Sequence, residues 1–156
     1  MMAGSTARVI VKITDDESLS AASDALHDAF FKPDDIVYEK DQKVFRVVMW
    51  REVYQLARKR RIIPFLYRIE TPWIRCELEL RSVKEASVEV TDGLGLTEYC
   101  LAEIRYDRGR GILGFDVMGP LKIELTVEEL YGEMRDVGNI TWEGPRICTV
   151  VPSWRP

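Results

Sequence analysis

The sequence predicts an α+β fold: a single antiparallel, β-rich domain with one main N-terminal helix packed on the sheet. Three observations support this. The chain has 156 residues, of which 46% are hydrophobic, and this suits one globular domain within the usual range of roughly 100–200 residues. Most segments alternate apolar and polar residues, as strands with one buried and one solvent-exposed face do. Only one N-terminal segment shows clear helical spacing.

The first predicted elements are a strand and the helix. Arg8–Ile13 alternates and is rich in β-branched residues, which favours a strand. Thr14–Glu17 then supplies cap candidates and negative charge for a helix N-terminus. Apolar residues recur at helical spacing from Leu19 onwards, so we expect a helix from about Asp16 to Phe30. Pro33 ends it, because the residue before a proline avoids the helical region.

Two hairpins are expected after the helix. In each, an alternating segment is followed by a short polar or glycine-rich link and then by a second apolar segment, which is the pattern of a β-hairpin. The first pairs Ile36–Glu39 with Val44–Trp50 through Lys40–Lys43, and the second pairs Glu103–Tyr106 with Ile112–Met118 through Asp107–Gly111.

The two hairpins resemble an internal repeat. A shift of 68 positions places Ile36 on Ile104 and Tyr38 on Tyr106, and it preserves which side chains share a face. Each hairpin is followed by another alternating strand, Glu77–Leu80 or Lys122–Leu125. The sequence therefore predicts two similar three-stranded units. Burial alone can produce the same pattern, so duplication and a shared burial pattern are both open interpretations.

Residues 52–73 form an insert within the first β unit of the single domain 1–156. Its N-terminal part, from Val53 to Arg61, fits a helix, and Ile62–Tyr67, which is apolar around a proline, fits a long hairpin arm or a flap. Further along, residues 128–136 fit either a short helix or a strand, and Arg146–Val151 fits a strand.

Charge is distributed unevenly along the chain. The net charge is −4 overall, −3 over residues 1–50, +5 over residues 51–84 and −6 over residues 85–156. An acidic chain is a poor general nucleic-acid binder, because such affinity grows with the number of phosphates neutralised. Basic and aromatic residues alternate in and around the insert, and we expect them to form the binding surface: Arg51, Tyr54, Arg58, Lys59, Arg60, Arg61, Phe65, Tyr67, Arg68 and Trp73.

This candidate surface has four interpretations. Arg, Tyr and Trp are the residues enriched at the centres of protein interfaces, which favours a protein partner. A basic arm of one copy on an acidic face of another would give self-association and an oligomer. Basic and aromatic residues together also bind single-stranded nucleic acid, while a simply solvated arm would have no partner.

Catalytic and metal chemistry find little support in the sequence. His27 is the single histidine, so a two-histidine metal site is excluded, and we expect no metal and no cofactor. His27 near the helix end, oriented by Asp24, is a candidate general base of a hydrolase-like enzyme. No nucleophile can be placed beside it from the sequence. The alternative is a helix-terminal histidine that complements the helix dipole.

The cysteines and the N-terminus bear on location. Cys76, Cys100 and Cys148 lie far apart without a CxxC pair, which is typical of reduced thiols. No segment is long and apolar enough to span a membrane, and residues 1–7 contain no apolar stretch typical of a secretory signal. We therefore expect a cytoplasmic protein with no membrane association.

One resemblance accompanies these observations. The string Leu26-His27-Asp28-Ala29, followed by Ile36-x-Tyr38 and a hairpin, resembles small uncharacterised bacterial domains, some of which are grouped with immunity-type proteins. The resemblance covers residues 26–50 and, through the repeat, 104–127, whereas the basic insert does not belong to that pattern. It implies a bacterial binding protein without catalytic residues. From the residues we likewise expect a non-catalytic, protein-binding or self-associating module.

Overall fold

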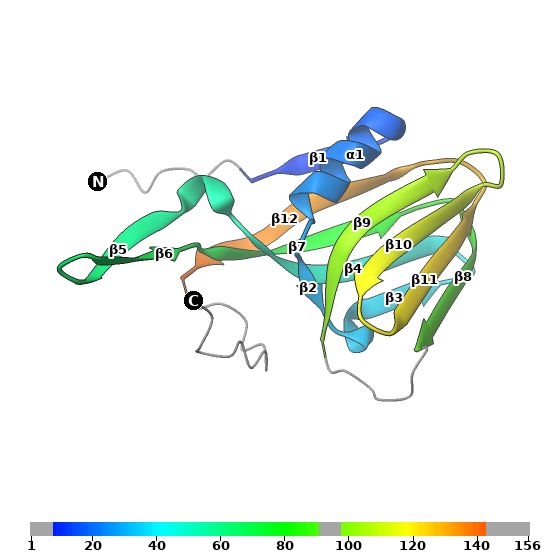
Figure 1. Ribbon diagram of the computed structural model, residues 1–156. Coiled ribbons are helices and arrows are strands. Elements are labelled where there is room, and N and C mark those ends of the chain that lie inside the picture. The colour runs from blue at the N-terminus through cyan, green and yellow to red at the C-terminus, as the bar shows by residue number, and fades with distance from the viewer. Residues whose placement is uncertain (1–7, 91–97, 143–156) are drawn as a thin grey trace.

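Antiparallel strands make up most of the structure, a computed structural model that describes residues 8–90 and 98–142 (Figure 1). The side chains of Arg60 and Ile62 are also left undescribed. The described residues contain one α-helix and a large antiparallel sheet, so the predicted α+β, β-rich fold is confirmed.

The elements follow one another in a simple order. The helix is α1 (Asp16–Ala25), and two short 3-10 turns cover Pro33–Asp35 and Tyr54–Leu56. The strands are β1 (Ile10–Ile13), β2 (Phe30–Phe31), β3 (Ile36–Glu39), β4 (Val44–Glu52), β5 (Arg58–Ile63), β6 (Leu66–Glu70), β7 (Trp73–Leu80), β8 (Val83–Val90), β9 (Tyr99–Asp107), β10 (Ile112–Met118), β11 (Leu121–Val127) and β12 (Gly132–Thr141).

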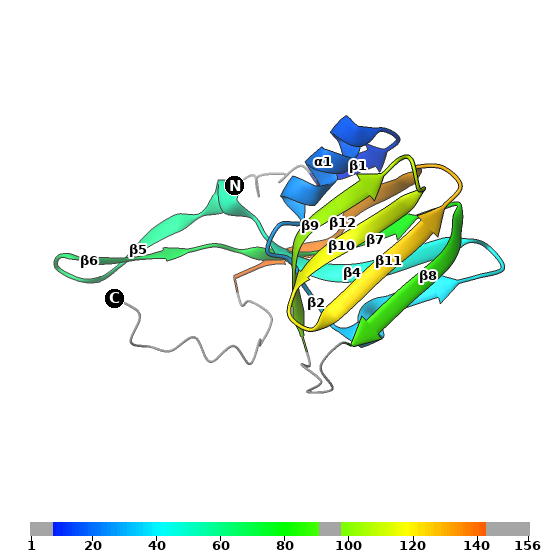
Figure 2. The same cartoon turned by 45° about the vertical axis from the view of Figure 1, so that its right-hand side comes forward.

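The main sheet bends back on itself to make two layers. Its strand order is β1-β12-β7-β4-β2-β9-β10-β11-β8, and β3 also pairs with β4. One layer holds β1, β12, β7, β4 and β3, and the other holds β9, β10, β11 and β8 (Figures 1 and 2). Strand β2 joins them, because Phe30 pairs with Trp50 of β4 and with Cys100 of β9.

The hydrophobic core lies between the layers. Phe45 of β4 and Phe115 of β10 meet edge to face at 5.9 Å between ring centroids. Alternate residues of the long strands point inward, and Leu78, Leu101 and Leu125 are fully buried. Burying a leucine side chain stabilises a fold by about 1.5–3 kcal/mol, so this central layer of side chains holds the bent sheet together.

Strand β4 is central, as its two largely apolar faces indicate. One edge pairs with β7, and the other pairs with β3 and then β2. The predicted hairpins β3–β4 and β9–β10 have equal loops, and their registers match under the 68-residue shift: Ile36 pairs with Val47 and Ile104 with Phe115. Two hairpins with loops of equal length have matching registers whether or not they arose by duplication. Internal duplication therefore stays a prediction.

Helix α1 covers the side of the core between β1 and β9. Asp15 caps its N-terminus by accepting a hydrogen bond from the Ser18 backbone N–H at 2.8 Å. The expected C-terminus at Phe30 is wrong, since the helix ends at Ala25. Tertiary pairing prevails over helical spacing there: Asp28 adopts φ +65°, and Phe30–Phe31 becomes β2.

Strand β8 is absent from the sequence-based prediction. Its register against β11 shifts between Thr126 and Val127, where Val127 pairs with Val83 and Thr126 with Glu85. Such a bulge reverses the alternation of apolar and polar residues partway along a strand. The pattern of β8 therefore does not show a regular period of two.

The remaining expectations concern the C-terminal part of the chain and membrane-spanning segments. Residues 132–141 form strand β12, not the alternative helix, because they pair with both β1 and β7. The expected strand at Arg146–Val151 lies outside the described residues. In the described part of the chain, no helix combines the length and apolar character needed to cross a membrane.

Candidate functional site

The insert forms a hairpin arm that stands apart from the main sheet. Among the described strands, β5 and β6 pair only with each other, in a separate two-stranded sheet, and extend sideways from the body (Figure 1). The stretch around Pro64 forms a hairpin arm, one of the two forms expected for it, whereas the expected helix from Val53 to Arg61 is wrong, apart from the short turn at Tyr54–Leu56. An isolated two-stranded hairpin is only marginally stable in water.

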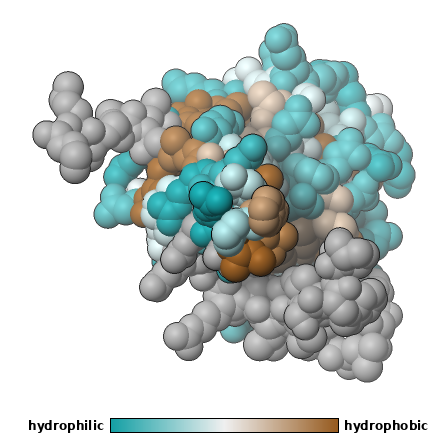
Figure 3. All heavy atoms as spheres, turned by 60° about the vertical axis from the view of Figure 1, so that its left-hand side comes forward, coloured by the Kyte–Doolittle hydropathy of each residue, from teal (hydrophilic) through white to brown (hydrophobic). Residues whose placement is uncertain are grey.

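The arm combines positive charge with exposed apolar side chains. Arg58, Lys59, Arg60, Arg61 and Arg68 stand against the one carboxylate of Glu70, giving residues 58–70 a net charge of +4. Its exposed apolar side chains are Ile63, Phe65, Leu66, Tyr67 and Ile69. Figure 3, which brings the arm side forward, shows hydrophobic and hydrophilic side chains next to one another on this face.

The tip of the arm has an unusual conformation. Pro64 and Phe65 are the two residues between the strands, and Phe65 has φ +97° with 97% of its surface exposed. A positive φ at the second turn position normally selects glycine, and holding another residue there costs about 1–3 kcal/mol. Neither local propensity nor burial accounts for a phenylalanine at this position.

Three of the arm's cations have no anionic partner among the residues that the structure describes. Lys59, Arg61 and Arg68 are exposed, and no ion pair joins them to any described side chain. Arg60 lies opposite Arg68 in the register of the two strands. Like charges in opposed positions destabilise a strand pair, so the ribbon would gain stability by placing anions beside it.

Arg58 anchors the base of the arm. Its guanidinium donates two hydrogen bonds of 3.1 Å to one oxygen of the Glu70 carboxylate and lies 3.7 Å over the Trp142 ring. Val53 N–H donates to the Pro72 carbonyl at 2.8 Å across the entry to the arm. These contacts orient the arm, while its outer part remains free of the body.

The prediction that Arg51 belongs to this exposed surface is wrong. Only 5% of Arg51 is exposed, and it donates two hydrogen bonds to Asp136, from Nε at 2.8 Å and from Nη2 at 2.6 Å. Burial acts to lower the Arg51 pKa, but the hydrogen bonds and negative charge of the Asp136 carboxylate outweigh it, so the Arg51 pKa is raised above its ordinary value. The alternation of β4 places position 51 on the inner face with Met49.

Tyr54 and Trp73 also lie at the base and not on the ribbon. Tyr54 is half exposed, and burial together with the neighbouring Glu52 and Asp28 carboxylates raises its pKa to about 12. Trp73 is half-buried and packs its ring 5.6 Å from that of Phe30. The structure therefore groups Arg58, Lys59, Arg60, Arg61, Phe65, Tyr67 and Arg68 on the arm and separates the other three candidates from them.

His27 lies just beyond the end of α1, beside a cleft of about 520 Å³ that Asp24, Ser20 and Ser23 also line. Its Nδ1 contacts the Ala102 carbonyl at 2.9 Å, and that hydrogen bond, followed by the Asp28 carboxylate, raises the His27 pKa. Ser23 Oγ accepts the Ile104 backbone N–H at 3.0 Å. Among the described side chains no serine or cysteine is hydrogen-bonded to His27, so the geometry offers it no nucleophile.

The two cysteines that the structure describes are poor nucleophiles. Cys76 is fully buried and burial raises its pKa to about 12, while burial and the Asp28 carboxylate raise the Cys100 pKa to about 11. The thiolate is the reactive form, so both thiols are unreactive near neutral pH. Cys148 lies outside the described residues. Within 8–90 and 98–142, no three His, Cys, Asp or Glu side chains cluster in a way that could hold a metal ion.

The sequence-based reasoning missed an acidic surface opposite in sign to the arm. The strand registers place six carboxylates and two cations on the outer face of the β9-β10-β11-β8 layer, a net charge of −4. They are Glu85, Glu89, Glu103, Asp107, Asp116 and Glu124, with Arg105 and Lys122. Only the pairing of the four strands brings these residues together, although the −6 of residues 85–156 indicated acidity in this part of the chain.

Strand β8 forms the edge of that surface. It pairs only with β11, so its other edge has no strand partner among the described residues. It exposes Val88 and Val90 as well as Glu85 and Glu89. Free strand edges are templates for pairing with another chain.

No family model, curated protein or solved structure matches the chain. The candidate functional site therefore rests on the geometry described above.

Proposed function

We propose that the protein is a non-catalytic binding module that self-associates, with the arm of one copy docking along strand β8 and the acidic outer face of a second copy. The observation that carries this proposal is the arm itself. A ribbon with net charge +4 and five exposed apolar side chains extends from a body that provides little cover for them. Surface apolar groups gathered in this way mark interaction sites.

Charge complementarity supports a second copy as the partner. The +4 of the arm equals in magnitude the −4 of the outer face defined above. Arm-to-arm contact is disfavoured, because it would oppose two clusters of like charge. The unpaired cations Arg61 and Arg68 would find carboxylates at Glu85 and Glu89.

Strand geometry supports the same partner. Strand β8 runs from Val83 to Val90, and within the described part of the chain one of its edges and one edge of each arm strand have no strand partner. Adding a strand to such an edge forms backbone hydrogen bonds, while alternate side chains provide specificity. Val88 and Val90 would then receive apolar side chains of the arm such as Ile69.

This interface is head-to-tail, because two different surfaces meet. Head-to-tail contacts produce rings or open chains unless they are capped. Wild-type protein should therefore form oligomers whose size rises with concentration and falls with salt, since screening weakens exposed charge pairs. Sedimentation velocity at low and high salt measures both effects.

Charge-reversal variants test the two halves of the interface separately. Arg61→Glu with Arg68→Glu should disable the arm, and Glu85→Lys with Glu89→Lys should disable the face, so each variant alone should be monomeric. Mixing the two should restore assembly beyond a 1:1 heterodimer, because the unchanged arm of one variant meets the unchanged face of the other, and the reversed arm carries charge opposite to that of the reversed face. Arg8→Glu with Lys40→Glu reverses two exposed charges elsewhere and should assemble like wild type.

Two results would refute this proposal. Wild-type protein that stays monomeric at low salt up to about 100 μM, far above a specific Kd of 1 μM, would show that no such interface forms. Variants that assemble normally would show that another surface is responsible.

A second candidate, nucleic-acid binding, rests on the shape of the arm. A two-stranded ribbon fits the major groove of DNA, and an apolar tip such as Pro64–Phe65 is the kind of side-chain wedge that some proteins insert between bases. The −8 on the remainder of the chain opposes close approach of the body to phosphates. A gel shift with single- and double-stranded oligonucleotides at about 50 mM salt should show no complex, and a salt-sensitive complex would favour this second function.

A further inference from the structure

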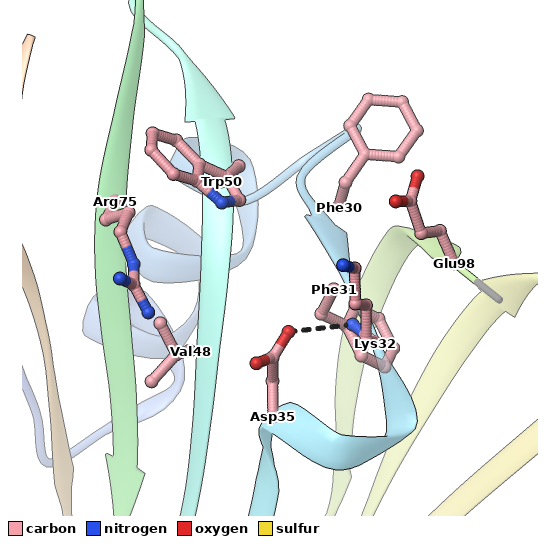
Figure 4. A pocket seen from close by; sticks show the side chains of 8 residues that line it. All are labelled: Phe30, Phe31, Lys32, Asp35, Val48, Trp50, Arg75 and Glu98. Carbon is pink, nitrogen blue, oxygen red and sulfur yellow. Dashed lines mark hydrogen bonds between the residues drawn. The ribbon is translucent and has the colours of Figure 1, made fainter. Parts of the chain in front are cut away.

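A cavity of about 370 Å³ lies where β2 joins the two layers (Figure 4). This volume falls within the usual range of roughly 300–1,000 Å³ for small-molecule sites. Trp50 and Val48 of β4 and Arg75 of β7 form one wall, as Figure 4 shows. The opposite wall comes from β2, the following 3-10 turn and the start of β9, through Phe30, Phe31, Lys32, Asp35 and Glu98.

Glu98 leaves an unsatisfied acceptor at this cavity. Its Oε2 atom is fully buried and accepts no hydrogen bond from any group that the structure describes. Buried polar atoms nearly always have a partner, and each exception requires an explanation. A donor N–H arriving with a ligand would supply the missing hydrogen bond.

Two cations at the cavity also lack anionic partners. The Arg75 guanidinium lies 5.7 Å from the Trp50 ring centroid, and no ion pair joins it to a described carboxylate. The Lys32 ammonium likewise has no ion pair within the described residues, because the contact of this residue with Asp35 is made by its backbone N–H at 3.0 Å. Other arginines differ: Arg46, Arg81 and Arg135 all pair with glutamates.

The cavity thus combines three features: an unpaired acceptor, unpaired cations and an aromatic wall. Arg75 and Lys32 suit a carboxylate, which arginine binds with two parallel hydrogen bonds. Glu98 suits an ammonium group. The Trp50 and Phe30 rings suit an apolar side chain that branches beside the two charged groups, as most small-molecule sites are lined by aromatic side chains with a few placed polar groups.

We propose that this cavity binds a free α-amino acid with an apolar side chain, with its carboxylate on Arg75 and Lys32 and its ammonium group on Glu98. The side chain lies against Trp50. The site uses none of the arm residues, so it stands whether or not the arm mediates self-association.

Isothermal titration calorimetry of the full chain with L-phenylalanine and L-leucine tests the proposal. Two analogues of phenylalanine separate its charged ends: 3-phenylpropionate lacks the amine, and 2-phenylethylamine lacks the carboxylate. Each should bind at least about tenfold more weakly than phenylalanine, because a hydrogen bond to a charged group is worth roughly one such factor or more. Neither ligand fluoresces under tryptophan excitation, so a change in tryptophan emission that disappears in Trp50→Phe locates the binding.

Matched variants assign the contacts. Glu98→Gln and Arg75→Gln should each weaken phenylalanine binding by about tenfold or more, and the unfolding temperature of each variant shows whether it is folded. Glu124→Gln and Arg135→Gln remove the same kinds of charge outside the cavity and should bind like wild type. Glu98→Gln should also abolish the preference for phenylalanine over 3-phenylpropionate.

Three outcomes would overturn the proposal. They are no heat of binding for either amino acid up to about 10 mM, weaker than a Kd of 1 mM; equal affinity for phenylalanine and both analogues; or unchanged affinity in the folded Glu98→Gln and Arg75→Gln variants. The analogue series uses wild-type protein, so it decides the question even if a variant does not fold.

Discussion

Arg51 and Asp136 form a buried ion pair that joins β4 to β12 beside the base of the arm. Two hydrogen bonds link the guanidinium to the carboxylate, and Asp136 Oδ2 also accepts the Val9 backbone N–H at 2.9 Å. The Asp136 N–H in turn donates to the Val9 carbonyl at 2.9 Å. The pair thus connects the N-terminal strand region, the last described strand and the strand that leads into the arm.

Removing one partner of this pair should be strongly destabilising. Arg51→Met leaves the Asp136 carboxylate buried without its cation, and we expect a loss of about 3–5 kcal/mol in the free energy of unfolding. Chemical denaturation measures it. The double variant Arg51→Met with Asp136→Leu should recover most of that loss, because no uncompensated charge remains. Equal losses in the single and double variants would show that packing, and not charge, is responsible.

Two strand glycines should respond oppositely to alanine. At Gly132 an added Cβ would lie 2.3 Å from the Glu79 carbonyl oxygen and 2.9 Å from a Leu80 methyl group, so the backbone would have to move. We expect Gly132→Ala to lower the unfolding free energy by about 1–3 kcal/mol.

Gly114 is the matched control, since an added Cβ there meets no atom within 4 Å. Gly114→Ala should raise stability by about 0.4–1 kcal/mol, because alanine loses less chain entropy on folding. Thermal unfolding of both variants tests the pair, and a stable Gly132→Ala protein would contradict the close packing of β12 on β7.

Tyr99 should be more stable as phenylalanine. Its hydroxyl is buried and has no hydrogen-bond partner in the described structure, while its ring packs 6.1 Å from that of Phe31. An unsatisfied buried polar group costs about 1–3 kcal/mol, so Tyr99→Phe should raise the unfolding free energy by about 1 kcal/mol. A clear loss of stability would instead reveal a partner for the hydroxyl.

The pKa of His27 should lie above its ordinary value of 6.5, because of the Ala102 carbonyl first and the Asp28 carboxylate second. A raised pKa in the folded state means that protonation favours folding. This contribution is therefore fully present below pH 6.5 and is lost as the pH rises through the folded-state pKa. His27 is the single histidine, so its NMR signal can be followed without assignment.

The variant Asp28→Asn separates the two causes. Asparagine tolerates the φ of +65° at this position, and it removes the negative charge next to His27. The His27 pKa should fall towards 6.5 and yet stay above it while the Ala102 contact persists. A wild-type pKa at or below 6.5 would contradict both contacts.

Where apolar and polar residues alternate regularly, the sequence pattern was sufficient to predict the bounds of the strand. The expected bounds Ile36–Glu39 and Ile112–Met118 are those of β3 and β10, and Asp15 and its neighbours indicated the start of α1. In these segments the burial of one face and the local hydrogen bonds are both set by nearby residues. The end of α1 and the course of β8 depended on pairing with distant strands, which no local period reveals.

The candidate sites likewise depended partly on the sequence alone and partly on the tertiary structure. The sequence by itself determined that positive charge and aromatic side chains concentrate in residues 51–73 and that the chain has a single histidine. Tertiary structure decided which of those residues face solvent: Arg51 lies inside against Asp136, whereas Phe65 stands free at the tip of the arm. It also decided the acidic outer face and the cavity at Glu98, because charges from four strands, or from both layers, become neighbours only when the sheet bends back on itself.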